Sequence, residues 1–261
     1  MFGLLQHLFH PTQCYALCAV ARSGAHLLSG ALQATHLAGR PLQYFHERLA
    51  HKYADRYGLD ATRNFAQYLR GLLTGAATSN GVFGFRIESF DVDWLVRRLR
   101  DTGEFGSSEA DERELLRAAF PRLRCVQLTR ENKLRQAISR ARAMQTNLWV
   151  PGKEHNVIGV PAFDPGLIDD CLVSATRAEE LWAEFFARNQ LDPFAITYEE
   201  LCSDYRRTVT RVFDFLRIRP PRHIDLGAPR TVRQADALTE EWVGKYRALR
   251  EAGAKSLNRE S

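Results

Sequence analysis

The sequence contains no run of the roughly 18 consecutive apolar residues that a membrane-spanning helix needs. Its first residues, MFGLLQHLFHPTQ, lack the basic start and the small-residue cleavage site of a secretory signal peptide. Cysteine is scarce: the 261 residues contain five, an odd number and widely scattered, which is typical of reduced thiols rather than of a disulfide framework. We therefore expect a soluble protein of the cytoplasm without a membrane span.

The sequence also has little that would bind nucleic acid or a metal. Its net charge is +5, but the 36 basic residues are distributed among 31 acidic ones, with no Lys/Arg block interleaved with aromatic residues. His7, His10, Cys14 and Cys18 can be imagined as a zinc set, but free cysteines are far more often core residues. The histidines of HERLAH, residues 46–51, are five apart instead of four, so they do not share a helix face. We therefore expect no nucleic-acid partner and no metal.

What the sequence does contain is an alternation of strand-like and helical patterns. Four short runs rich in Val, Ile, Leu and Phe predict buried strands, at residues 14–20, 81–88, 123–130 and 193–201. Helical patterns occupy the intervening and following segments, at residues 27–35, 93–100, 113–119, 131–145, 177–189, 205–216 and 238–251. This alternation predicts an α/β fold, a three-layer sandwich with a mainly parallel central sheet. No repeat or domain boundary interrupts it, so one domain over residues 1–261 is expected.

The first predicted strand runs into a turn that suits an anion, Arg22-Ser23-Gly24-Ala25-His26. A tight turn from a strand into a helix directs several backbone N–H groups, and the positive end of the helix dipole, at one point. Gly24 permits backbone conformations closed to other residues, and the Arg22 guanidinium matches oxyanion oxygens. The Gly-Lys-Ser/Thr ending of a Walker loop is absent, which disfavours a magnesium-dependent ATPase, GTPase or kinase. Taken alone, the turn is equally well explained as an ordinary strand–helix connection.

Two further segments suggest a second anion contact and a covering loop. Arg130 ends the third predicted strand and Ser139 lies in the helix after it, an arrangement that can clasp another phosphate. Taken alone, the pair is better explained as a surface arginine and an exposed helical serine. Residues 150–169 contain three prolines and three glycines, and long irregular segments of this kind are commonly lids or binding loops.

These features occur in the order found in one known family. The chain resembles the bacterial carbohydrate sulfotransferases similar to trehalose 2-sulfotransferase, over residues 22–45, 80–87, 130–149, 198–201 and 233–247. The resemblance implies a P-loop-like sulfotransferase fold. It also implies transfer of a sulfuryl group from 3′-phosphoadenosine 5′-phosphosulfate (PAPS) to a hydroxyl of a carbohydrate or a glycosylated small metabolite. Members of the family often dimerise, so a homodimer is a further expectation.

The resemblance also assigns residues to the nucleotide. The turn residues Arg22, Ser23, Gly24, Ala25, His26 and Leu27 would surround the 5′-phosphosulfate. Arg130 and Ser139 match the family's arginine and serine that bind the 3′-phosphate. Arg233 and Gln234 match its C-terminal nucleotide-side segment. Trp149, with the loop after it, would cover the acceptor, although a core position explains the tryptophan equally well.

At the transfer site this sequence departs from the family. Arg86 occupies the place of a usual lysine, at the carboxyl end of the second strand. Gln43 replaces the catalytic glutamate of the stretch Pro-x-Glu-Tyr/Phe-Phe, and a neutral amide can orient a hydroxyl but cannot accept its proton. Three interpretations stay open. His26, His46 or Glu47 takes the proton; the acceptor needs little deprotonation; or the protein binds PAPS without efficient turnover.

Overall fold

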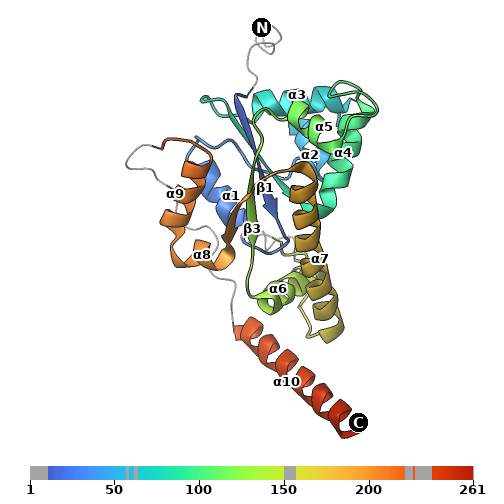
Figure 1. Ribbon diagram of the computed structural model, residues 1–261. Coiled ribbons are helices and arrows are strands. Elements are labelled where there is room, and N and C mark those ends of the chain that lie inside the picture. The colour runs from blue at the N-terminus through green and yellow to red at the C-terminus, as the bar shows by residue number, and fades with distance from the viewer. Residues whose placement is uncertain are drawn as a thin grey trace.

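The computed structural model describes residues 11–56, 59–61, 64–149, 157–220, 226 and 237–260 (Figure 1). Within these residues the centre is a sheet of four strands in the order β2-β1-β3-β4. The strands are β1 (Gln13–Ala19), β2 (Val82–Glu88), β3 (Arg124–Thr129) and β4 (Phe194–Thr197). Every pairing between them is parallel. The predicted parallel sheet is confirmed, and each strand starts within one residue of its predicted start.

Helices cover both faces of this sheet (Figure 1). Side chains of β1 alternate between the two cores, because successive residues of a strand point to opposite faces. Cys14, Ala16 and Cys18 join the core formed with α3 (Phe65–Gly75), α4 (Val92–Asp101), α5 (Glu112–Ala119) and α7 (Pro165–Asn189). Tyr15 and Leu17 join the core formed with α1 (Ala25–Ala34) and α9 (Tyr205–Phe215). The three-layer α/β sandwich is therefore confirmed.

The C-terminal helix α10 (Ala237–Glu260) packs on α6 (Lys133–Thr146) and on the start of α7. Trp242, Val243 and Tyr246 of α10 form a third apolar cluster there. Two polar contacts fix the start of α10: the Arg142 guanidinium donates to Thr239 Oγ1 at 2.7 Å, and Arg135 pairs with Glu240. Figure 1 shows α10 leading the chain away from the sheet. Within the described part of the chain, no helix has the length and apolarity to cross a bilayer.

Two predicted elements differ from the structure because helix-starting signals override the local pattern. The strand expected over residues 193–201 ends at Thr197, and α8 (Tyr198–Ser203) follows. Thr197 and Glu200 form a capping box there, which satisfies the first N–H groups of α8. Helix α7 begins at Pro165 rather than near Arg177, with Asp164 as its N-cap, so the loop expected over 150–169 ends earlier. Residues 150–156 lie outside the described residues.

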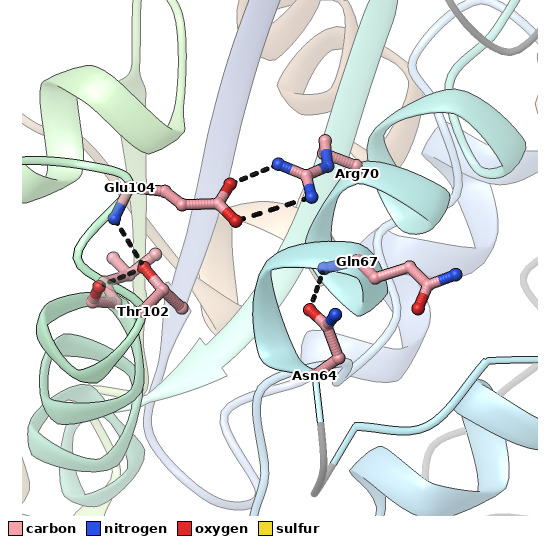
Figure 2. Close-up of polar contacts among 6 residues, drawn as sticks. Asn64, Gln67, Arg70, Thr102 and Glu104 are labelled. Atoms are coloured by element: carbon pink, nitrogen blue, oxygen red, sulfur yellow. Dashed lines mark hydrogen bonds and ion pairs between the residues drawn. The ribbon is translucent and has the colours of Figure 1, made fainter.

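Besides α8, two helices were not predicted: α2 (Ala50–Arg56) and α3. Figure 2 shows how α3 is held at its start and its middle. Asn64 Oδ1 accepts a hydrogen bond from the Gln67 N–H at 2.9 Å, and Arg70 forms an ion pair with Glu104, which follows α4. Together these contacts attach α3 to its neighbours beside the sheet.

We expect Asn64→Ala to destabilise the protein more than Glu104→Ala. The first removes the acceptor of a helix N-terminal N–H, which costs about 1 kcal/mol. The second breaks an ion pair whose side chains are 51% and 42% exposed, and such pairs contribute roughly 0–1 kcal/mol. Urea unfolding of the two variants and of the parent protein measures the difference. A larger loss for Glu104→Ala would contradict this ranking.

Candidate functional site

A cavity of about 680 Å³ opens at the carboxyl ends of the strands. Residues at or just after the end of each strand line it: Val20 after β1, Glu88 of β2, Arg130 after β3 and Tyr198 after β4. After β1 the chain forms β2 on one side of it and later β3 on the other. The crevice beside such a reversal of strand order is where open parallel sheets bind ligands. A smaller cavity, of about 440 Å³, lies around Gln13 and Arg124 at the other end of the sheet.

The turn between β1 and α1 has the backbone of an anion site. Arg22 and Gly24 both have a left-handed backbone, with φ of 65° and 90°. A Cβ atom at Gly24 would lie 2.6 Å from Cδ2 of Tyr198, so glycine is required here for its small size as well as for its backbone. Helix α1 begins at Ala25 without a side-chain cap. Its first N–H groups therefore have no acceptor within the helix and can receive an oxyanion.

The structure brings Arg22, Arg130 and Ser139 together at this turn. Arg22 Nε donates to Ser139 Oγ at 2.9 Å, and Arg22 Nη1 donates to the Trp149 carbonyl at 2.6 Å. Arg130 Nη1 donates to the Arg22 carbonyl at 3.4 Å, and its guanidinium lies 4.4 Å from the centre of the Tyr198 ring. Burial, and then the charge of Arg130, lower the pKa of Arg22 to about 10, so Arg22 stays cationic at neutral pH. Two half-buried guanidinium groups this close favour a multiply charged anion between them.

Contacts from α6 and α8 hold the Arg130 segment in place. The Glu199 carboxylate accepts the backbone N–H groups of Glu131 and Asn132, at 2.9 and 3.2 Å. Gln136 Nε2 donates to the Ala21 carbonyl at 2.8 Å, which ties α6 to the turn after β1. Nε of Arg130 is buried with no hydrogen-bond partner among the described residues. Its guanidinium is positioned firmly yet keeps unused hydrogen-bonding capacity.

A second polar group lies at the end of β2, where Gln43 joins Arg86 to Asp91. The backbone of Leu42 forms a parallel bridge with Phe85, and this places Gln43 beside β2. Gln43 Oε1 accepts from Arg86 Nη2 at 3.0 Å, while Nε2 donates to Asp91 Oδ2 at 3.2 Å. A glutamate in this position would set its charge against that of Asp91. The amide of Gln43 thus offers an acceptor to the Arg86 guanidinium and a donor to the Asp91 carboxylate.

The cavity wall near Arg86 carries two further titratable groups. The His26 imidazole is open to the cavity, but protein surrounds most of it; this partial burial, with the charges of Arg86 and Arg22, lowers its pKa to about 3. Glu88 lies two residues after Arg86. Burial raises the pKa of Glu88, against the lowering effect of Arg86. In both groups, burial disfavours the charged form.

The geometry agrees with comparisons with known proteins. The Stf0 sulphotransferase family model matches residues 14–249. The chain belongs to the Stf0 sulfotransferase family. Two trehalose 2-sulfotransferases match most of its length. The protein from Mycolicibacterium smegmatis is 28% identical, over 91% of this chain and 95% of its own. The protein from Mycobacterium tuberculosis is 26% identical, over 90% and 94%. A sulfotransferase structure from Alicyclobacillus acidocaldarius has 14% identity and a TM-score of 0.48, covering 93% of this chain and 96% of its own.

Most residues assigned from the resemblance line the cavity of this Stf0 sulfotransferase. Lining residues among them are Arg22, Gly24, Ala25, His26, Leu27, Gln43, Arg86, Arg130, Ser139 and Trp149. Ser23 is fully buried beneath the turn, and its hydroxyl has no partner among the described residues. Glu47 is exposed and does not line the cavity, and residues 43–47 form turns rather than the helix that would set Glu47 one helical turn past Gln43. Arg233 and Gln234 lie outside the described residues.

The cavity of the Stf0 sulfotransferase also contains residues that the sequence did not single out. Tyr198 packs against both Gly24 and Arg130. Arg140 and Glu88 line the wall, and Thr239 brings α10 to it. The position of Glu88 can be read from the sequence in part, because residue i+2 of a strand shares the face of Arg86. Within the described ranges no group of three His, Cys, Asp or Glu side chains is arranged to hold a metal ion.

Proposed function

We propose that the protein transfers a sulfuryl group from PAPS to a hydroxyl of a carbohydrate or of a glycosylated small metabolite. Membership of the Stf0 family supports the reaction class, and the similarity to two trehalose 2-sulfotransferases supports a sugar acceptor. The observation that carries the proposal is the convergence of Arg22, Arg130 and Ser139 on the anion-binding turn at one cavity.

Both charged groups of the nucleotide, the 5′-phosphosulfate and the 3′-phosphate, bind at the turn between β1 and α1. The backbone N–H groups at the start of α1 hold the 5′-phosphosulfate, with support from the helix dipole. The side chains of Arg22, Arg130 and Ser139 hold the 3′-phosphate, because the structure places Arg22 Nε on Ser139 rather than over the start of α1. The resemblance to the family adds Arg233 and Gln234, which lie outside the described residues, to the nucleotide side.

The acceptor occupies the part of the cavity near the end of β2. Its hydroxyl oxygen attacks sulfur in line with the bond to the 5′-phosphate, so positive charge near the transferred group lowers the barrier. Arg86 supplies that charge, and Gln43 fixes the orientation of its guanidinium through the 3.0 Å hydrogen bond. Trp149, with its side chain 40% exposed at the cavity, offers an aromatic surface to a sugar. Sulfuryl transfer of this kind requires neither a metal nor a covalent intermediate.

Nucleotide binding and transfer test the proposal separately. Calorimetry should show that 3′-phosphoadenosine 5′-phosphate binds about 10- to 100-fold more tightly than adenosine 5′-phosphate, since charge-assisted hydrogen bonds contribute about 1.5–3 kcal/mol. Labelled PAPS should then sulfate at least one member of a panel of disaccharides and glycosides that includes trehalose. Preferential binding of magnesium-ATP would contradict the proposal.

A second candidate function follows from Gln43. With an amide where the family has its catalytic glutamate, the protein can be a PAPS- or nucleotide-binding protein with weak or no turnover. Tight binding of the bisphosphate together with failure to sulfate any acceptor of the panel would select this alternative.

A further inference from the structure

Sulfuryl transfer releases the proton of the acceptor hydroxyl, and Gln43 cannot accept it. We propose that Glu88 is the general base of this enzyme and takes the place of the missing glutamate. This inference rests on the proposed function, and it names a residue that the sequence resemblance does not supply.

The position of Glu88 in the sheet suits this role. It is the last residue of β2 and pairs in register with Ala19, the last residue of β1, three residues before Arg22 of the turn. It shares a strand face with Arg86, which binds Gln43. Among the described residues that line the cavity, Glu88 is the only one with a carboxylate. Asp91 does not line the cavity, and its carboxylate accepts from Gln43.

The other candidates are less suited to accept a proton. Both ends of the Gln43 amide are engaged, one with Arg86 and one with Asp91. Glu47 is exposed outside the cavity. His26 lies near two arginines whose charges oppose its protonation. His46 lines the cavity, but its Nδ1 already accepts the Arg48 N–H at 3.1 Å, so it is the competitor that the experiment must exclude.

The surroundings of Glu88 raise the affinity of its carboxylate for a proton. Burial raises its pKa and the charge of Asp91 adds to this, while Arg86, Arg140 and His46 act in the opposite direction. A carboxylate with a raised pKa binds a proton more tightly and is a better general base at pH 7 than an ordinary exposed glutamate. Because the carboxyl must be ionised to accept a proton, turnover should rise with pH through the pKa of Glu88.

The acceptor oxygen forms a bond to sulfur while the bond between sulfur and the bridging phosphate oxygen breaks. The electron pair of the broken bond leaves with the 5′-phosphate of 3′-phosphoadenosine 5′-phosphate. The hydroxyl proton moves to a carboxylate oxygen of Glu88 and is released to solvent after the products leave.

The test compares Glu88→Gln with a matched control, Glu47→Gln, in the full-length enzyme. Glu88→Gln should lower kcat by about 10²- to 10⁴-fold, the range for loss of a general base, and should abolish the acid limb of the pH–rate profile. Its dissociation constant for 3′-phosphoadenosine 5′-phosphate should stay within about threefold of the parent value. Glu47→Gln should leave both quantities unchanged. Glu88→Asp, which keeps the carboxylate but shortens the side chain, should retain the acid limb with an intermediate loss of kcat.

A rescue variant tests whether a carboxylate at the family position can replace that of Glu88. Glu88→Gln combined with Gln43→Glu keeps the net charge and returns a carboxylate to the family position, so it should recover much of the lost turnover. The proposal is wrong if Glu88→Gln keeps its kcat and acid limb, or if His46→Gln removes that limb while Glu88→Gln does not. It is also wrong if Glu88→Gln loses nucleotide affinity as strongly as turnover. Failure of the parent protein to transfer sulfate to any acceptor would instead refute the proposed function, and this inference with it.

Discussion

Replacing Arg130 by alanine should weaken the binding of 3′-phosphoadenosine 5′-phosphate about 100-fold. The guanidinium lies against the Tyr198 ring, touches the Arg22 carbonyl and has a buried Nε without a partner among the described residues. Charge-assisted hydrogen bonds to a phosphate contribute about 1.5–3 kcal/mol, and each 1.4 kcal/mol changes affinity tenfold. Titration calorimetry at constant ionic strength measures the change.

The matched control for this experiment is Arg211→Ala. Arg211 also lies over an aromatic ring, that of Phe194 at 5.3 Å, and pairs with Glu200, but it does not line the cavity. It should leave nucleotide affinity within about twofold. An unchanged dissociation constant for Arg130→Ala, or equal losses in both variants, would remove Arg130 from the nucleotide site.

Replacing Trp182 by alanine should lower the free energy of unfolding by about 3–5 kcal/mol, the range for removing a large aromatic side chain from a core. The indole is fully buried, stacks on Phe186 with ring centres 5.5 Å apart and meets the edge of Phe185. Its Nε1 donates to the Ala19 carbonyl at 3.1 Å, at the end of β1. The substitution therefore leaves a cavity and also an unsatisfied carbonyl just before the turn between β1 and α1.

Trp149 provides the comparison, because it is the same residue type with its side chain 40% exposed. Trp149→Ala should cost less than about 1 kcal/mol, as exposed substitutions usually do. Its contact with Arg22 is made by the backbone carbonyl and survives the change. Denaturant unfolding of both variants measures the difference. Similar losses in the two variants would mean that Trp182 does not anchor the core between α7 and the sheet.

Hydrophobic patterning predicted the sheet well, because its strands are short apolar runs that few helices resemble. Prediction failed where a polar signal decides the element. Tyr198 and Leu201 suggested that the fourth strand continues, but the capping box formed by Thr197 and Glu200 begins a helix. Pro165 suggested a loop, although proline in the first turn after an Asp N-cap is compatible with a helix. Helix starts are set by backbone hydrogen bonds, which apolar periodicity does not report.

The site could be predicted only as far as chain order allowed. Strand ends fixed where Arg22, Arg86 and Arg130 would gather, since the carboxyl ends of parallel strands share one edge of a sheet. The contact of Arg22 with Ser139 was not foreseen, because it depends on how α6 crosses the turn. Glu88 was missed for a similar reason: an acidic residue at a strand end is ordinary until its burial against the cavity is known.

The arrangement of β1 also has a kinetic consequence. Ala19 has Glu88 as its neighbour on one side and Leu128 on the other, so the central strand finds its partners only after long stretches of chain have been made. Contacts between such distant segments close large loops and slow the folding reaction. Until residues 124–129 have been synthesised, β1 has a pairing partner on one side only. We therefore expect the sheet to close late during synthesis, whatever chemistry the finished protein performs.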